Sequence, residues 1–109
     1  MAYATVDELA AGLRIRVNPD NTDLLQACLD AAAVEIDHEA DRRADDPIDP
    51  ADALANRLNV LRGVEWYKAN DAAFGIIGSD DTGALQAPRD GFNRHRFTLS
   101  PLKQQHGIA

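Results

Sequence analysis

The chain has 109 residues, a formal net charge of −7 and 6% aromatic residues, and alanine supplies much of its 45% apolar content. A chain of this length forms one small domain, and its alanine-rich composition favours helix. The acidic balance disfavours nucleic-acid binding through the body of the protein, because carboxylates repel phosphates. No apolar run approaches the roughly 20 residues of a membrane span, and the first residues lack the pattern of a signal peptide. We therefore expect a helical protein without a membrane partner.

The first predicted helix covers about Val6 to Leu13. Thr5 stands three residues before Glu8, the spacing at which a hydroxyl and a carboxylate satisfy free backbone N–H groups at a helix start. The apolar residues that follow have spacings of three and four, which place them on one helix face. Pro19 then interrupts the pattern.

Two longer helices are predicted, over about Thr22–Asp45 and Pro50–Phe74. The first of these contains no glycine or proline and carries one apolar stripe. Pro47 ends it, and Asp49 before Pro50 is typical of an N-cap followed by the first helical position. The short link predicts an antiparallel pair. The predicted fold class is therefore all-α: a short N-terminal helix plus a long antiparallel helical hairpin, with an extended loop and C-terminal arm.

The helix predicted over Pro50–Phe74 has apolar residues on two sides. A helix of this kind needs cover on both sides, and the first helix is too short to span the hairpin. We therefore expect either the C-terminal third of the chain or another subunit to supply the missing cover. The residues predicted for a subunit interface lie on the second apolar side. They are Val60, Val64, Tyr67 and Phe74.

The C-terminal part differs from the rest in charge and in pattern. Residues 1–81 hold 17 acidic and 7 basic residues, a net charge of −10, whereas residues 82–109 hold 1 acidic and 4 basic residues, a net charge of +3. Glycines and prolines between residues 75 and 91 predict a long loop, and Ser100 before Pro101 predicts a short helix that is marginal by itself. The predicted organisation is a helical bundle over residues 1–74, then a loop and extended C-terminal arm over residues 75–109.

Patterns that indicate catalysis or metal binding are weak. Glu35 and His38 have the Glu-x-x-His spacing of di-iron bundles, but those sites need a second such motif and two more carboxylates. Arg42 stands where the zincin motif requires its second histidine. No serine has the surroundings of a nucleophile. The single cysteine, Cys28, lies among alanines at a position that predicts burial, and a chain without a disulfide suits a reducing compartment. We therefore predict no enzymatic activity, no metal and no cofactor.

Two charged features remain to be interpreted. Three acids form a ridge around Val34, where a solvated face is the simple interpretation and a wall that must not hold DNA is the functional one. They are Asp30, Asp37 and Asp41. The basic C-terminal end, with Arg94 and Arg96 beside phenylalanines, suits docking on a protein, binding to nucleic acid or closure of the monomer's own core. The acidic body favours protein docking.

Four blocks of sequence resemble the head-tail connector proteins of long-tailed phages, also called head completion or adaptor proteins. The blocks are YATVDELAAGLRI, DLLQACLDAAAVEIDHEADR, ANRLNVLRGVEWYKANDAAFGI and RHRFTLSPLKQQHGIA, which together cover nearly the whole chain. The resemblance implies a structural virion protein that forms a homo-oligomeric ring, typically dodecameric, between the portal and the tail. Such a ring extends the DNA channel after packaging.

The resemblance also implies partners and a location. We expect the chain to be made in the bacterial host cytoplasm and to lie in the virion neck, between the phage portal protein and a downstream connector or tail-terminator protein. DNA passes through the lumen without specific binding, and the acids around Val34 face this channel. Seven residues of the portal-docking arm match the family in character. They are Arg94, Arg96, Phe97, Leu99, Pro101, Leu102 and Lys103.

The alternative interpretation is a small acidic regulatory protein whose basic tail folds on a protein partner. A tail of this kind orders only when its partner is present. A regulator remains a monomer or a dimer, whereas a connector forms a ring on the portal, so the assembly state separates the two.

Overall fold

The computed structural model describes residues 2–77, 85, 87–88 and 91–103, with side chains in the longest helix described up to Asn70. The helices are α1 (Val6–Leu13), α2 (Thr22–Ala40), α3 (Ala53–Ile77), η1 (Phe92–His95), α4 (Arg96–Leu99) and η2 (Ser100–Leu102). No strand occurs in these described ranges, which confirms the predicted all-α class. None of the described helices has the length and apolarity that a membrane span requires.

α1 begins at a capping box. The Thr5 hydroxyl accepts a hydrogen bond from the Glu8 backbone N–H at 3.2 Å, and the Glu8 carboxylate accepts one from the Thr5 N–H at 2.9 Å. Each side chain thus satisfies a backbone donor that the first turn leaves free. The helix ends at Arg14, whose φ of 60° takes the backbone into the left-handed region.

α2 ends at Ala40, several residues before the predicted end at Asp45. Asp41 adopts a left-handed conformation with a φ of 53°, which breaks the helix. The Arg42 side chain then donates to the carbonyl oxygens of Asp46 and Leu102, and Ile48 is buried in the core. These tertiary contacts outweigh the local preference for another helical turn, because they bury an apolar side chain that a longer helix would leave in solvent.

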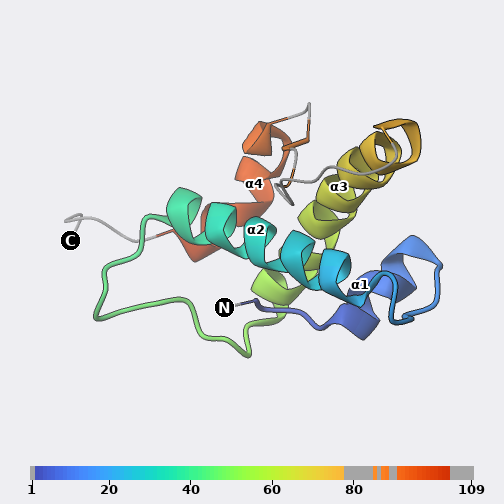
Figure 1. Cartoon of the computed structure of the whole chain (residues 1–109). Helices are drawn as coiled ribbons and strands as arrows, with labels where there is room; N and C mark the ends of the chain where they lie inside the picture. The colour runs from blue at the N-terminus through green and yellow to red at the C-terminus, as the bar shows by residue number, and fades with distance from the viewer. Residues whose placement is uncertain (1, 78–84, 86, 89–90, 104–109) are drawn as a thin grey trace.

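α3 begins three residues later than predicted, at Ala53. Asp52 is its N-cap: Asp52 Oδ1 accepts hydrogen bonds from the backbone N–H groups of Leu54 and Ala55 at 2.8 and 3.0 Å. Asp49, the predicted N-cap, accepts a hydrogen bond from Ala51 in the preceding turn. The link between α2 and α3 thus covers residues 41–52, and α3 rises obliquely away from α2 toward its C-terminal end (Figure 1).

Two apolar clusters occupy opposite ends of the contact between α2 and α3. At one end α1 covers a cluster built on Leu9, Leu25 and Leu29. At the other end Ile36 and Leu58 pack with Phe92, Leu99 and Leu102 of the C-terminal segment, the name used here for residues 91–103. Figure 1 shows α1 and this segment, in blue and red, at opposite ends of α2. Both apolar sides of α3 are therefore covered within one chain over much of its described length.

This arrangement corrects the prediction of an extended arm. Leu99 and Leu102 are 1% and 5% exposed, and the C-terminal segment consists of helical turns on the chain's own α2 and α3. The short helices η1, α4 and η2 are enough to cover this apolar cluster, because loop 41–52 contributes Ile48 to it as well. Closure of the monomer core, one of the three roles considered for this segment, is the one that the structure displays. The part of the predicted Pro101–His106 helix that follows Lys103 lies outside the described residues.

Leu99→Ala tests whether the C-terminal segment is part of the folding unit. We expect the free energy of unfolding to fall by about 2–5 kcal/mol, because the change leaves a cavity in the core. Phe97→Ala, two residues away and 91% exposed, is the matched control and is expected to change it by less than about 0.5 kcal/mol. Urea unfolding followed by circular dichroism measures both. Equal effects of the two variants would mean that the segment does not belong to the core.

Candidate functional site

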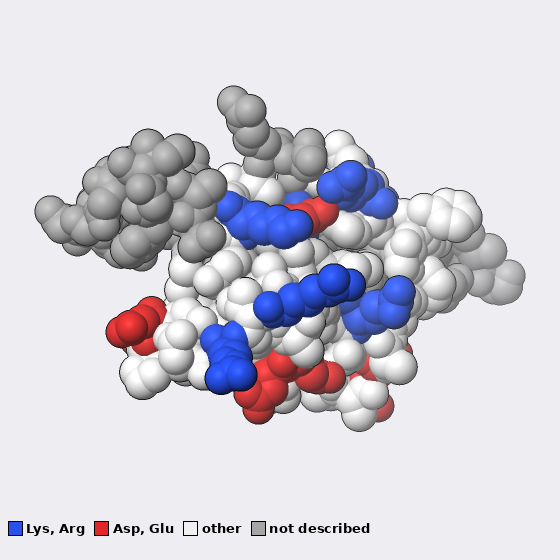
Figure 2. Space-filling view, turned by 90° about the vertical axis from the view of Figure 1, so that its right-hand side faces the viewer, with Lys and Arg blue, Asp and Glu red and all other residues white. Residues whose placement is uncertain are grey.

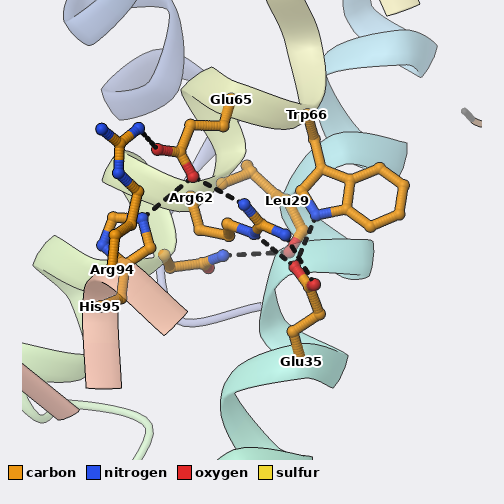
Figure 3. Close-up of polar contacts among 8 residues, drawn as sticks. Leu29, Glu35, Arg62, Glu65, Trp66, Arg94 and His95 are labelled. Atoms are coloured by element: carbon orange, nitrogen blue, oxygen red, sulfur yellow. Dashed lines mark hydrogen bonds and ion pairs between the residues drawn. The ribbon is translucent and has the colours of Figure 1, made fainter. Parts of the chain in front are cut away.

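Arg62 of α3 carries a charged side chain into the interior, where it is 2% exposed. Its Nε and Nη2 atoms donate to the two carboxylate oxygens of Glu35 on α2 at 2.7 and 2.9 Å, and its Nη1 atom donates to Glu65 Oε1 at 2.7 Å. Figure 3 shows the guanidinium between the two glutamates. The planar fork of arginine suits this two-sided, bidentate arrangement, which lysine has too few fixed donors to reproduce.

Two aromatic residues complete the surroundings of this ion pair. Trp66, one turn along α3 from Arg62, donates from its indole nitrogen to Glu35 Oε1 at 2.6 Å. The Arg62 guanidinium carbon lies 5.8 Å from the centre of the Phe92 ring, within the range of a cation–π contact. α2, α3 and the C-terminal segment therefore meet at one buried charge.

Glu65 connects the C-terminal segment to the buried Arg62 ion pair. His95 Nε2 lies 2.9 Å from Glu65 Oε1, and Arg94 Nη1 donates to Glu65 Oε2 at 2.9 Å (Figure 3). A second ion pair joins Arg96 to Glu39 of α2 at 2.9 Å. The basic charge of the C-terminal segment is thus largely directed at carboxylates of the same chain.

The two glutamates have pKa values below their ordinary range. Burial by itself raises the pKa of Glu35, but hydrogen bonds from Arg62 and Trp66 outweigh it and lower the pKa. Burial acts in the same sense on Glu65, where hydrogen bonds from Arg62, His95 and Arg94 likewise lower the pKa. Both carboxylates are therefore held ionised, which keeps a countercharge beside the buried guanidinium.

Asn59 is a second buried polar residue, one turn before Arg62 on α3. Its Oδ1 atom accepts hydrogen bonds from the backbone N–H groups of Tyr3 and Ala4 at 2.7 and 2.9 Å, and its Nδ2 atom donates to the carbonyl of Leu29 at 3.0 Å. It fixes the N-terminal segment to α2. Neither Asn59 nor Arg62 was predicted as a buried residue, although each interrupts the apolar pattern of α3, and that interruption was the available signal.

The predicted docking residues do not share one environment. Leu99 and Leu102 are buried, so they are unavailable to a partner in this conformation, and Arg94 and Arg96 form ion pairs within the chain. Phe97, in contrast, is 91% exposed at the surface of the C-terminal segment. Two further predicted residues are exposed near it in sequence. These are Pro101 and Lys103.

The predicted subunit-interface residues lie partly within the fold. Val60, Val64 and Tyr67 are half-buried and pack against the cluster covered by α1. The side chain of Phe74 lies outside the described residues. Val60 and Val64 also line an open groove of about 630 Å³ along α3, whose wall includes Leu61, Lys68 and Arg94.

The three predicted channel-facing acids are all exposed, Asp30 and Asp37 on α2 and Asp41 directly after its end. Val34 lies among them and is 63% exposed. The Tyr3 hydroxyl donates a hydrogen bond to Asp37, and burial together with this bond raises the pKa of the tyrosine. The three acids are thus open to solvent, and their facing a channel stays a prediction.

Two of the side chains considered for catalysis or metal binding, Cys28 and Glu35, have structural roles. Burial raises the pKa of the Cys28 thiol to about 12, which disfavours the reactive thiolate. Glu35, one half of the Glu-x-x-His spacing, binds Arg62. Among the described residues, no three His, Cys, Asp or Glu side chains are grouped so as to hold a metal ion.

No family model, curated protein or solved structure matches this chain. Its surfaces must therefore be interpreted from their own chemistry and from the resemblance in sequence. The surface that Figure 2 shows carries Lys and Arg side chains across its middle, whereas Asp and Glu side chains gather mainly along its lower edge. Basic and acidic side chains are thus largely separated on this face of the molecule.

Glu35→Gln tests the buried ion pair. We expect the free energy of unfolding to fall by about 3 kcal/mol, because a buried guanidinium loses one of its two carboxylates. Glu39→Gln removes the partner of a guanidinium that is 61% exposed and is the matched control, with an expected loss of less than about 1 kcal/mol. Thermal and urea unfolding measure both. Similar losses for the two variants would mean that the buried position of Arg62 has no special importance.

The lowered pKa values of Glu35 and Glu65 predict loss of stability in acid. Their contribution is present above the unfolded-state pKa, near 4.5, and is lost as the pH falls through the lower folded-state values. The Glu65→Gln variant should therefore show a flatter fall of melting temperature between pH values of about 5 and 2 than the wild type. Identical pH profiles would contradict the assignment of Glu65 as an ionised partner of Arg62, Arg94 and His95.

Proposed function

We propose that this chain is a structural subunit of the phage virion neck, a head-tail connector that forms a ring on the portal and extends the DNA channel. The observation that carries the proposal is the 91% exposure of Phe97 on a segment whose neighbouring apolar residues are buried. A large aromatic side chain held in solvent by a folded segment is the kind of residue that anchors protein interfaces. The sequence resemblance assigns this same segment to portal docking.

The docking surface that we propose is the outer face of the folded C-terminal segment. Phe97 is its centre, and Arg94 and Arg96 flank it at 58% and 61% side-chain exposure. Arginine is enriched at interfaces and can keep one carboxylate partner while it offers further donors to another. In this proposal Leu99 and Leu102 support the surface from inside, while Pro101 and Lys103 belong to its edge.

The remaining parts of the proposal follow from the resemblance. Copies of the chain form a homo-oligomeric ring, with twelve copies in the related family, in which the pair α2 and α3 serves as the antiparallel hairpin of that family. The portal lies on one side, and a downstream connector or tail-terminator protein lies on the other. The function is mechanical and electrostatic: the ring holds two virion parts together while DNA passes through its lumen.

Binding to the portal tests this function. The purified full chain, mixed with the portal ring of the same phage, should add a ring of density to the portal in negative-stain images. Phe97→Ser should weaken binding by about 30-fold, the loss of a typical interface hot spot, with an unchanged circular dichroism spectrum. Val17→Ser, at another exposed apolar residue, is the matched control and should bind like the wild type. A wild-type chain that remains a monomer or dimer beside the portal would support a small regulatory protein instead.

A further inference from the structure

Two strips of helix surface have the same spacing and opposite charge. The acidic strip consists of Asp30, Val34 and Asp37 on α2 and of Asp41, the residue that follows this helix. The basic strip on α3 consists of the exposed Arg57, Leu61 and Lys68 and the half-buried Val64. Both sets have spacings of four, three and four residues, which keep them within a narrow sector of the helix surface. Each strip is about 16 Å long at 1.5 Å per residue.

Each strip has an exposed apolar residue near its centre. Val34 is 63% exposed in the acidic strip and Leu61 is 41% exposed in the basic strip. Among the described residues only two other large apolar side chains are exposed, Val17 in a loop and Phe97. The two longest helices of the molecule therefore both expose apolar surface at the middle of a charged row.

The strips cannot meet within one chain. On α2 the buried residues Leu29, Ala32 and Ile36 lie on the side of the helix away from Val34. On α3 the buried residues Leu58 and Arg62 likewise lie away from the exposed row. Because the buried sides of α2 and α3 face each other, the two strips are directed away from each other. Complementary surfaces that face apart on one molecule suit contact between successive copies.

Four charged side chains of the strips, two on each, are available for such a contact. Within the part of the chain that the structure describes, Asp30 and Asp37 form no ion pair, and neither do Arg57 and Lys68. Asp30 accepts a hydrogen bond from Gln26 and Asp37 one from Tyr3, both of which leave the negative charge uncompensated. In contrast, the carboxylates that hold the fold together, Glu35 and Glu65, already have cationic partners.

We propose that the acidic strip of one copy packs against the basic strip of the next copy in the ring. The inference rests on the proposed function and specifies its subunit contact. Val34 meets Leu61 at the centre, and the acids on either side of this apolar pair lie opposite Arg57 and near Lys68 when the two helices run parallel. Because the two surfaces are different and lie on different sides of the molecule, the contact is heterologous, which excludes a two-fold dimer and allows a closed ring.

This contact gives the acids a role other than lining the channel. A valine that is exposed in a row of carboxylates gains nothing from a water-filled lumen, whereas burial against Leu61 removes two apolar side chains from solvent. The surrounding charges then select the correct neighbour, because two acidic strips or two basic strips repel each other.

A charge-swap pair tests the contact. Arg57→Glu with Lys68→Glu makes both strips acidic, and Asp30→Lys with Asp37→Lys makes both strips basic. Each double variant alone should form at least tenfold fewer rings on portal than the wild type, as counted in negative-stain images. An equal mixture should restore them, because alternating copies place an acidic strip against a basic strip at every contact. Wild-type ring numbers from either variant alone, or failure of the mixture with both chains folded by circular dichroism, would overturn the inference.

Crosslinking gives a second test that needs no change of charge. In a Cys28→Ala background, Val34→Cys with Leu61→Cys should yield, on oxidation of the portal-bound protein, a ladder of covalent multimers that dithiothreitol dissolves. Either cysteine alone should give no ladder. Rings on the portal without a ladder would overturn the strip contact and leave the connector function standing. A chain that forms neither rings nor a ladder would overturn both.

Discussion

Arg62 imposes the strongest constraint in this fold, because a guanidinium stays charged at any pH at which the protein exists. A charge that is 2% exposed is tolerated only when countercharges surround it, and here they come from Glu35 on α2 and Glu65 on α3. This requirement fixes how the two helices face each other. It also leaves Glu65 with oxygens that reach Arg94 and His95, so the same carboxylate that neutralises the core positions the C-terminal segment.

This constraint explains where the basic charge of the C-terminal segment goes. A segment that belongs to the same chain as the acidic body meets that body at a high effective concentration, before any partner arrives. Arg94 and Arg96 therefore pair with Glu65 and Glu39, and Leu99 and Leu102 complete a cluster that α2 and α3 leave open. What the segment retains for a partner is its outer face, above all the ring of Phe97.

The proposed functions of the surface divide between two separate regions. The C-terminal segment lies at one end of α2 (Figure 1) and presents an aromatic anchor. The two charged strips lie on α2 and α3 and are directed away from each other. A ring subunit needs this separation, since contacts with neighbouring copies and contacts with the portal are made at the same time. The buried ion-pair network keeps the two regions in a fixed arrangement. A rigid arrangement reduces the conformational entropy that is lost on assembly.

Local patterns in the sequence were sufficient for the helices and their class. Apolar spacing and the pair Thr5 and Glu8 specify elements whose hydrogen bonds form within a few residues, and the ridge around Val34 follows from helical geometry alone. The tertiary structure decided where α2 ends, at Ala40, and where α3 begins, at Ala53. It also decided the interior positions of Asn59 and Arg62 and the folding of the C-terminal segment. Each of these results from contacts between distant parts of the chain, such as the bond from Arg42 to the Leu102 carbonyl, and periodicity carries no information about which distant surfaces meet.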